Sequence, residues 1–169
     1  MSDKIAIIWV LLLSLVAGVP ASANAQSKES GKADPRIAKA LEDIGFKYQV
    51  TPLGNCRLSF NLPGGREHLV FVSSRTDTFD GLETRRVWAT VSRSPEPPTQ
   101  AVASKLLMDN LKQKLGAFEL GQTDDGGYKI SYSARVAAAC PVSTLRAAIR
   151  IVLYSADDKE KELTGKDEH

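Results

Sequence analysis

Histidine is scarce in this chain, which limits the catalytic chemistry that it can support. Only His68 and His169 are present among 169 residues, and His169 is the last residue. A serine or cysteine nucleophile would therefore depend on His68 as its base. His68 follows a turn and precedes an apolar strand, where a solvated or capping histidine is the common case. No G-x-S-x-G or H-E-x-x-H pattern occurs, so we expect no catalytic residues and no enzyme activity.

Closely spaced metal ligands are also missing. Structural zinc needs four ligands, whereas the two cysteines lie far apart in the sequence. Asp77, Asp80 and Gly81 resemble part of a calcium loop, but no regular series of oxygen ligands and no terminal glutamate completes it. The glycine pairs at 64–65 and 126–127 belong to turns and do not join a strand to a helix, as a phosphate cradle requires. We expect no metal and no cofactor.

An excess of charge of either sign is absent. The chain has 22 basic and 20 acidic residues, and its formal net charge is +2. No basic block is interleaved with aromatic residues, so nucleic-acid binding is not expected.

A single long apolar run lies near the N-terminus. Residues 5–19 are apolar, follow Lys4 and precede two overlapping A-x-A sites that end at Ala23 and Ala25. This pattern is typical of a secretory signal peptide, and we predict that residues 1–25 are removed after Ala25. The mature chain would be periplasmic or secreted, with no stable membrane anchor after cleavage. A permanent N-terminal anchor is the alternative.

Cysteine is limited to Cys56 and Cys140. An even number of cysteines in an exported chain predicts a disulfide, here between these two residues. Closing such a long loop would stabilise the fold by about 4–5 kcal/mol in the loop-entropy model. The alternative is two buried free thiols.

The clearest structural pattern lies at residues 56–72. Cys56, Leu58, Phe60 and Leu62 alternate with polar residues, and a Pro-Gly-Gly turn separates them from the apolar run 69–72. This arrangement predicts a β-hairpin in which Gly64 takes a positive φ.

Capping residues and hydrophobic periodicity predict three helices. The first runs from the Asp34 cap through Pro35 to Gly45, and the second from Thr99 to about residue 115. The last helix opens at Pro141 or Ser143, and its tail, which is charged from Asp157 onward, is expected to fray before His169. On the second helix we expect one buried side. Its residues would be Val102, Leu106, Leu107, Leu111 and Leu115.

Further strands are predicted at 82–91, 118–122 and 128–136, whereas 73–81 is predicted as a polar connection. Residues 46–50 alternate and are a candidate for the beginning of the sheet. The predicted order is α-β-β-β-α-β-β-α. It favours an α+β fold in which an antiparallel sheet of about five strands carries its helices on one face.

We expect the chain to contain a single folded domain. After the signal peptide we expect a disordered lead-in at 26–33, one domain at 34–163 and a frayed tail at 164–169.

This order of elements, with Gly45-Phe46-Lys47-Tyr48 after the first helix and the segment 58–66 at the hairpin, resembles the YbjN-type bacterial domains. Those domains belong to the type III secretion chaperone-like fold, and the likeness spans residues 34–163. The resemblance implies dimerisation and binding of other polypeptides on sheet and helix surfaces. It implies no catalytic residues. The signal peptide and the cysteine pair depart from the cytoplasmic secretion chaperones.

Two side chains are candidates for partner binding. Trp88 alternates with Val87, Ala89 and Val91, which places it on the open face of the sheet if those three residues face the core. The opposite assignment, with Trp88 in the core, is the alternative. Arg86, next to Arg85 and accompanied by Arg75 and Arg93, offers contact to an anionic group, although a solvated strand edge is the commoner meaning of such residues.

Together these features predict an exported, non-enzymatic module that binds another protein, as a homodimer or with an unknown partner. The alternative function is a periplasmic carrier that holds a small molecule or peptide between the sheet and the helices.

Overall fold

The structure is a computed structural model, and it describes residues 31–165. The predicted signal peptide, most of the predicted lead-in and residues 166–169 lie outside the described residues. Within residues 31–165 the elements are α1 (Pro35–Ile44), β1 (Gln49–Val50), β2 (Cys56–Leu62), β3 (Arg66–Phe79), β4 (Leu82–Ser94), α2 (Gln100–Asn110), β5 (Ala117–Gln122), β6 (Tyr128–Ala137) and α3 (Val142–Thr164). In this part of the chain no helix is both long and apolar enough to cross a membrane.

The strands form one antiparallel sheet of six in the order β1-β2-β3-β4-β6-β5. This confirms the predicted α+β class. β1 is one strand more than the predicted order contains, and it occupies part of the 46–50 segment that alternated in sequence.

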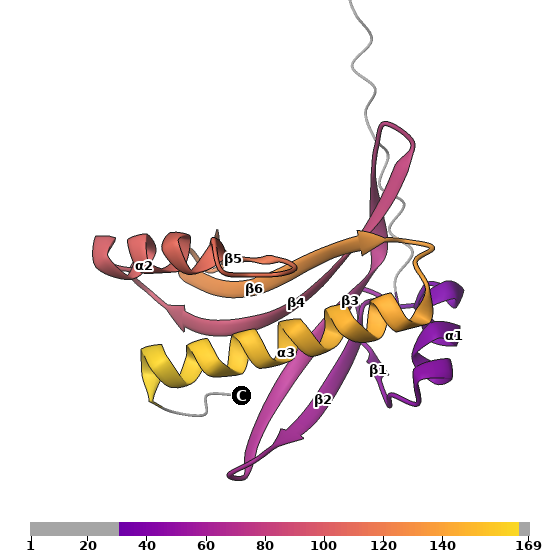
Figure 1. Ribbon diagram of the computed structural model, residues 1–169, viewed down its shortest axis with the longest axis horizontal. Helices are drawn as coiled ribbons and strands as arrows, with labels where there is room; N and C mark the ends of the chain where they lie inside the picture. Colours follow the sequence, from indigo (N-terminus) through magenta and orange to yellow (C-terminus); the bar gives the residue numbers. More distant parts are fainter. Residues whose placement is uncertain (1–30, 166–169) are drawn as a thin grey trace, which may run out of the picture.

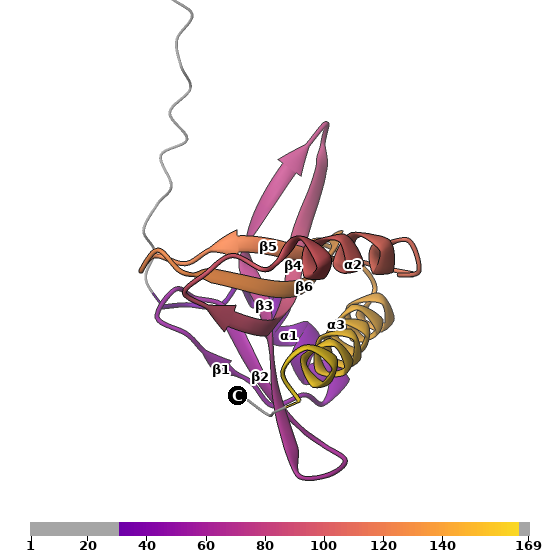
Figure 2. The same ribbon diagram turned by 90° about the vertical axis from the view of Figure 1, so that its left-hand side faces the viewer.

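One face of the sheet supplies most of the core. Val87, Ala89 and Val91 of β4 are fully buried, and α3 packs across β3, β4 and β6 on that side. α1 packs against α3, and α2 lies on the same side of the sheet near β5 (Figures 1 and 2). No helix within residues 31–165 covers the opposite face of the sheet, which we call the open face.

Local sequence signals account for the first helix and the first hairpin. The Asp34 carboxylate accepts a hydrogen bond from the backbone N–H of Arg36, and Gly45 ends α1 in the left-handed conformation with φ 82°. At the β2–β3 turn Gly64 has φ 84°, as the turn chemistry requires. Both predictions are confirmed.

The predicted polar connection at 73–81 is wrong. β3 continues to Phe79 and pairs with β4 through Leu82, so that only Asp80 and Gly81 remain as the turn. Both turn residues have positive φ, 48° and 78°, which is the requirement of a two-residue type I′ hairpin. The segment is polar because this hairpin projects from the body and both of its faces meet solvent (Figure 1).

The charged end of the last helix is more buried than its composition suggests. α3 continues to Thr164, and Asp157, Lys159 and Glu160 are buried. These charged side chains are held by partners distant in sequence, which a local reading of the charged tail could not anticipate.

Candidate functional site

Among the helices of residues 31–165, the most exposed apolar side chains lie on α2 and directly after it. The exposed fractions are 69% for Leu107, 66% for Met108 and 88% at Leu111, which directly follows the helix. We call these three residues the α2 apolar face. The prediction that Leu107 and Leu111 pack inside is therefore wrong. Only Leu106 of α2 is buried, because the next element of the chain covers one narrow side of this helix.

Hydrogen bonds hold α2 in this orientation. The side-chain amide of Asn110 both accepts from the backbone N–H of Phe118 (2.7 Å) and donates to its carbonyl oxygen (3.2 Å), which ties the helix end to β5. Gly116 joins the two elements with φ 91°. A Cβ atom there would lie 2.3 Å from the carbonyl oxygen of Ser133, so only glycine allows this close approach.

Basic residues flank the α2 apolar face. Lys105 and Lys112 have side chains that are 51% and 77% exposed, and Lys114 is also exposed. Asp109 and Glu162 are the acidic residues beside them: the Asp109 carboxylate accepts from Lys159 at 2.6 Å, and Glu162 pairs with Lys105 at 2.9 Å. The bond from Lys159, assisted by Lys112 and Lys105, lowers the pKa of Asp109 to about 2. The surface is therefore apolar, and the lysines at its rim are partly paired with acidic residues.

The open face of the sheet carries Trp88, as one of the two sequence alternatives placed it. Its ring stacks on Phe71 of the neighbouring strand, with ring centroids 5.4 Å apart and planes inclined by 16°. The guanidinium carbon of Arg86 lies 5.2 Å from the centroid of the Trp88 ring, within the range of a cation–π contact. Arg86 also pairs with Glu119 of β5.

Trp88 is half-buried. Phe71 on one side and Arg86 on the other already contact its ring. The structure thus brings the two sequence-predicted partner-binding residues, Trp88 and Arg86, into direct contact. Because both side chains are half-buried, they expose less apolar surface to a partner than the α2 apolar face does.

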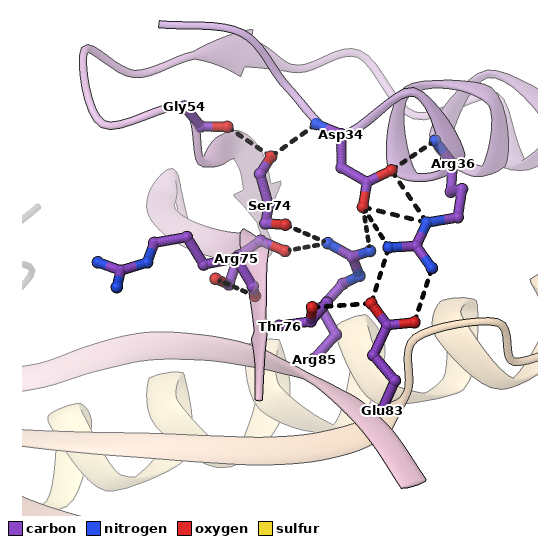
Figure 3. A network of polar contacts seen from close by, with 9 residues as sticks. Asp34, Arg36, Gly54, Ser74, Arg75, Thr76, Glu83 and Arg85 are labelled. Carbon is purple, nitrogen blue, oxygen red and sulfur yellow. Dashed lines mark hydrogen bonds and ion pairs between the residues drawn. The ribbon is translucent and has the colours of Figure 1, made fainter. Parts of the chain in front are cut away.

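Arg85, the neighbour of Arg86, does not lie at a solvated strand edge. β4 is a central strand, and the Arg85 side chain is 1% exposed. Its guanidinium donates to the Asp34 carboxylate at 2.6 Å and to the carbonyl oxygens of Ser73 and Ser74 (Figure 3). Arg36 joins Asp34 to Glu83 in the same network.

This network fixes the start of α1 against the β3–β4 hairpin. Burial alone would raise the pKa of Asp34, but the hydrogen bonds from Arg36 and Arg85 outweigh it and hold that pKa well below its usual range. Hydrogen bonds from Arg36 and Thr76 lower the pKa of Glu83 to about 2. The arrangement is a structural joint in which the charges are paired.

His68 is fully buried under α3 rather than solvated. One ligand atom each from His68, Asp157 and Glu160 lies within 4.8 Å of the others, a spacing that a metal ion could use. However, Arg66 already donates to Asp157 at 2.8 Å and to Glu160 at 2.7 Å. A metal ion would have to displace this guanidinium, so the cluster fits an ion-paired contact between β3 and α3 better than a metal centre.

A cavity of about 460 Å³ lies between α1 and the connection from β6 to α3. Its lining includes the apolar residues Ile37, Ala40, Val136 and Leu145. The guanidinium of Arg85 and the thiol of Cys140 also line it. The volume is within the range of small-molecule sites. The Nε of Arg85 has no hydrogen-bond partner among the described residues, which leaves one buried donor in the lining.

The two cysteines are free thiols in the structure, Cys56 buried and Cys140 half-buried. Burial raises the pKa of Cys56 to about 11 and also raises that of Cys140. A neutral thiol is a weak nucleophile. The predicted disulfide is not present in the structure and stays a prediction.

The fold and these surfaces define an antiparallel α+β domain that offers an exposed apolar helix face, a mixed aromatic and cationic sheet face and one apolar cavity. No protein-family model matches the sequence, and no curated protein matches it. Among solved structures, the chain is similar to YbjN from E. coli, a protein proposed to be a transcription regulator. The identity is 13%, the TM-score is 0.49, and the match covers 76% of this chain and 89% of that one. This distant similarity is to the same kind of domain that the sequence resembles.

Proposed function

We propose that this protein is an exported, non-enzymatic module that binds another polypeptide through the α2 apolar face. One observation carries the proposal: Leu107, Met108 and Leu111 are 66–88% exposed and lie close together at the end of one short helix. Contiguous apolar surface of this kind is costly in water and marks interaction sites. Leucine at positions i and i+4 is the usual spacing for docking a helix against a partner.

The rim of the α2 apolar face suggests the chemistry of the partner. Lys105, Lys112 and Lys114 lie close to the leucines in sequence and are exposed, while the acidic residues beside them, Asp109 and Glu162, are paired with Lys159 and Lys105. An apolar segment flanked by acidic residues would complement this surface in shape and charge. We expect a partner of that chemistry, with a second copy of the chain as the competing occupant.

The absence of catalysis is part of the proposal. The domain has one histidine among its described residues, His68, and this residue is buried against Glu160 outside the lining of the cavity. Neither thiol has a lowered pKa. These features support binding rather than bond-making.

Export rests on the leader at residues 1–25. Intact-mass measurement of the protein recovered from the medium or the periplasm should show a chain that begins at Gln26. A chain that retains Met1 and stays with the cell membrane would support the permanent anchor instead.

Site-specific photocrosslinking tests the binding surface. A photoreactive phenylalanine analogue at position 111 should give one discrete adduct in cells that make the protein, because Leu111 would contact the partner. The same analogue at position 53 is the matched control, since Leu53 is 78% exposed but lies in the loop before β2. Light scattering of the purified protein then shows whether the partner is a second copy.

For the next test the photoreactive analogue is placed at position 107. The proposal predicts that Leu111→Ser then abolishes the adduct and that Leu53→Ser leaves it unchanged. Both substitutions should change stability by less than about 0.5 kcal/mol because the side chains are exposed. Equal adducts at positions 53 and 111, or none at either, would contradict it. Loss of the adduct on Trp88→Ala or Arg86→Gln would extend the binding surface to the open face of the sheet.

The cavity supports a second candidate function, a carrier of a small apolar molecule. An apolar chain would fill the lining around Ile37 and Leu145, and an acceptor group would meet the free Nε of Arg85. Under reducing conditions, decanoate should slow the alkylation of Cys140, which lines the cavity. Cys56 is buried elsewhere and reports any general unfolding. Unchanged alkylation of Cys140 at saturating decanoate would exclude this candidate.

A further inference from the structure

The open face of the sheet contains a pair of like charges in direct register. Arg93 of β4 lies opposite Lys129 of β6, and neither side chain makes a hydrogen bond or ion pair within residues 31–165. Side chains opposite each other on one face of an antiparallel ladder approach closely, so two cations there repel each other. Lys129 is half-buried, which leaves this repulsion less screened than it would be in open solvent.

Other cationic and polar groups lie next to this pair. Arg86 is on the same face and shares its guanidinium with Glu119. Burial lowers the pKa of Lys129, and the nearby charges of Arg93 and Arg86 lower it further. Asp124 and Glu119 act in the opposite direction but more weakly. The ammonium group of Lys129 therefore sits in a locally positive environment.

Two donors nearby lack partners. Ser131 precedes Tyr132 and follows Ile130, both of which face the core, so its side chain is on the open face between Thr90 and Glu119. The hydroxyl of Ser131, a residue only 2% exposed, and the Nε of Arg86 have no hydrogen-bond partner among the described residues. Buried polar groups are nearly always paired, so unpaired ones point to a ligand or an ordered water.

The backbone is irregular at the same place. The register between β4 and β6 shifts between Thr90 and Ser92, and this shift brings Arg93 rather than Ser92 opposite Lys129. Bulges of this kind redirect side chains and are common beside binding sites. Without the shift, the strand alternation would not place the arginine on the open face beside the lysine.

We infer that Lys129, Arg93 and Arg86, with the hydroxyl of Ser131, form a binding site for a phosphate group on the open face of the sheet. Neither Arg93 nor Lys129 has an ion-pair partner within residues 31–165, although Asp125 lies near Arg93 and Asp124 and Glu119 lie near Lys129. A dianionic phosphate can pair with both cations, whereas a single carboxylate satisfies one. Phosphate oxygens also accept several hydrogen bonds at once, which matches the unpaired donors of Ser131 and Arg86. The inference does not depend on the α2 apolar face, which lies on the other side of the sheet.

Calorimetric titration with inorganic phosphate tests the site, at constant ionic strength with sodium chloride as the compensating salt. We expect saturable binding to the wild-type protein. Lys129→Gln and Arg93→Gln should each weaken it by about tenfold or more, because each removes a charge-assisted contact. Arg57→Gln is the matched control, since Arg57 is an exposed cation of β2 on the same face. This control should change the affinity by less than about twofold.

A stability measurement separates a binding role from a structural one. Without phosphate, Lys129→Gln should melt at or above the temperature of the wild-type protein because it removes the repulsion with Arg93. With phosphate present, the wild-type protein should gain more stability than this variant does. A clear loss of stability in Lys129→Gln without phosphate would identify Lys129 as a structural residue and overturn the inference.

The source of the phosphate group is distinguished by the choice of ligand. Inorganic phosphate and phosphoserine carry the same group, and acetate at matched ionic strength is the carboxylate comparison. Tighter binding of phosphoserine indicates a phosphorylated molecule, whereas tighter binding of inorganic phosphate indicates the free ion. Equal responses to phosphate in Lys129→Gln, Arg57→Gln and the wild-type protein would show a general salt effect and would contradict the site.

Discussion

The ammonium group of Lys159 on α3 donates to the carboxylate of Asp109 on α2 at 2.6 Å, across 50 residues of sequence. Both side chains are largely enclosed, with exposed fractions of 8% and 14%. α2 makes few other contacts with the body, because one face of the helix is exposed. This ion pair, together with the Asn110–Phe118 hydrogen bonds, therefore determines where the α2 apolar face is presented.

We expect Lys159→Ala to lower the free energy of unfolding by about 1–2 kcal/mol, because Asp109 would lose its closest charged partner. Hydrogen exchange at residues 100–110 should also become faster, since α2 would be held less firmly. Lys112→Ala is the control: Lys112 contacts the same carboxylate at 3.4 Å but is 77% exposed. It should cost less than about 0.5 kcal/mol. Equal effects of the two substitutions would contradict the role of Lys159.

Arg85 provides the second comparison. Its buried guanidinium holds Asp34 and two carbonyl oxygens, so Arg85→Met should destabilise the protein by about 3–5 kcal/mol through the charge and the acceptors left unpaired. Arg135→Met removes a guanidinium that pairs with Asp77 at the surface, where both side chains are more than half exposed. That change should cost at most about 1 kcal/mol. Urea unfolding of the two variants measures the difference, and similar midpoints would contradict it.

The pairing of Glu83 predicts a dependence of stability on pH. Its pKa in the folded protein is about 2, below the ordinary value of 4.5. Stability from this carboxylate is complete above pH 4.5 and is lost as the pH falls toward 2. Glu83→Gln should therefore give a shallower loss of unfolding free energy between pH 4.5 and 2. Arg36→Gln removes the main cause of the shift and should have the same effect; an unchanged slope in both variants would refute the assignment.

Local signals in the sequence were sufficient for the elements that depend on local chemistry. The Asp34 cap, the Gly45 exit and the Pro-Gly-Gly turn each act within a few residues, and the alternation in β4 correctly placed Val87 and Trp88 on opposite faces. The β3–β4 hairpin was missed although Asp80-Gly81 is a strong two-residue turn signal. The polar composition of residues 73–79 obscured a strand pair that is solvated on both faces.

The remaining differences arise from contacts that periodicity does not encode. A row of leucines shows that a helix has an apolar face, but not that another element covers it, and this is why Leu107 and Leu111 were expected inside. Burial of a charged residue depends on partners elsewhere in the chain: Arg66 reaches Asp157 across 91 residues. The Arg93–Lys129 register likewise depends on a bulge, which the strand pattern alone does not predict.

The cysteine pair gives the last prediction. Exported protein should carry a Cys56–Cys140 bridge, so its intact mass after alkylation without reduction should show no added label. Reduction should then allow two labels and lower the stability by up to about 4–5 kcal/mol, because the bridge closes a long loop. The free thiols in the structure predict a different outcome, in which half-buried Cys140 is labelled without reduction and buried Cys56 only after unfolding. If Cys140 of the exported protein is labelled without reduction, the bridge is excluded and Cys140 is a free thiol in the lining of the cavity.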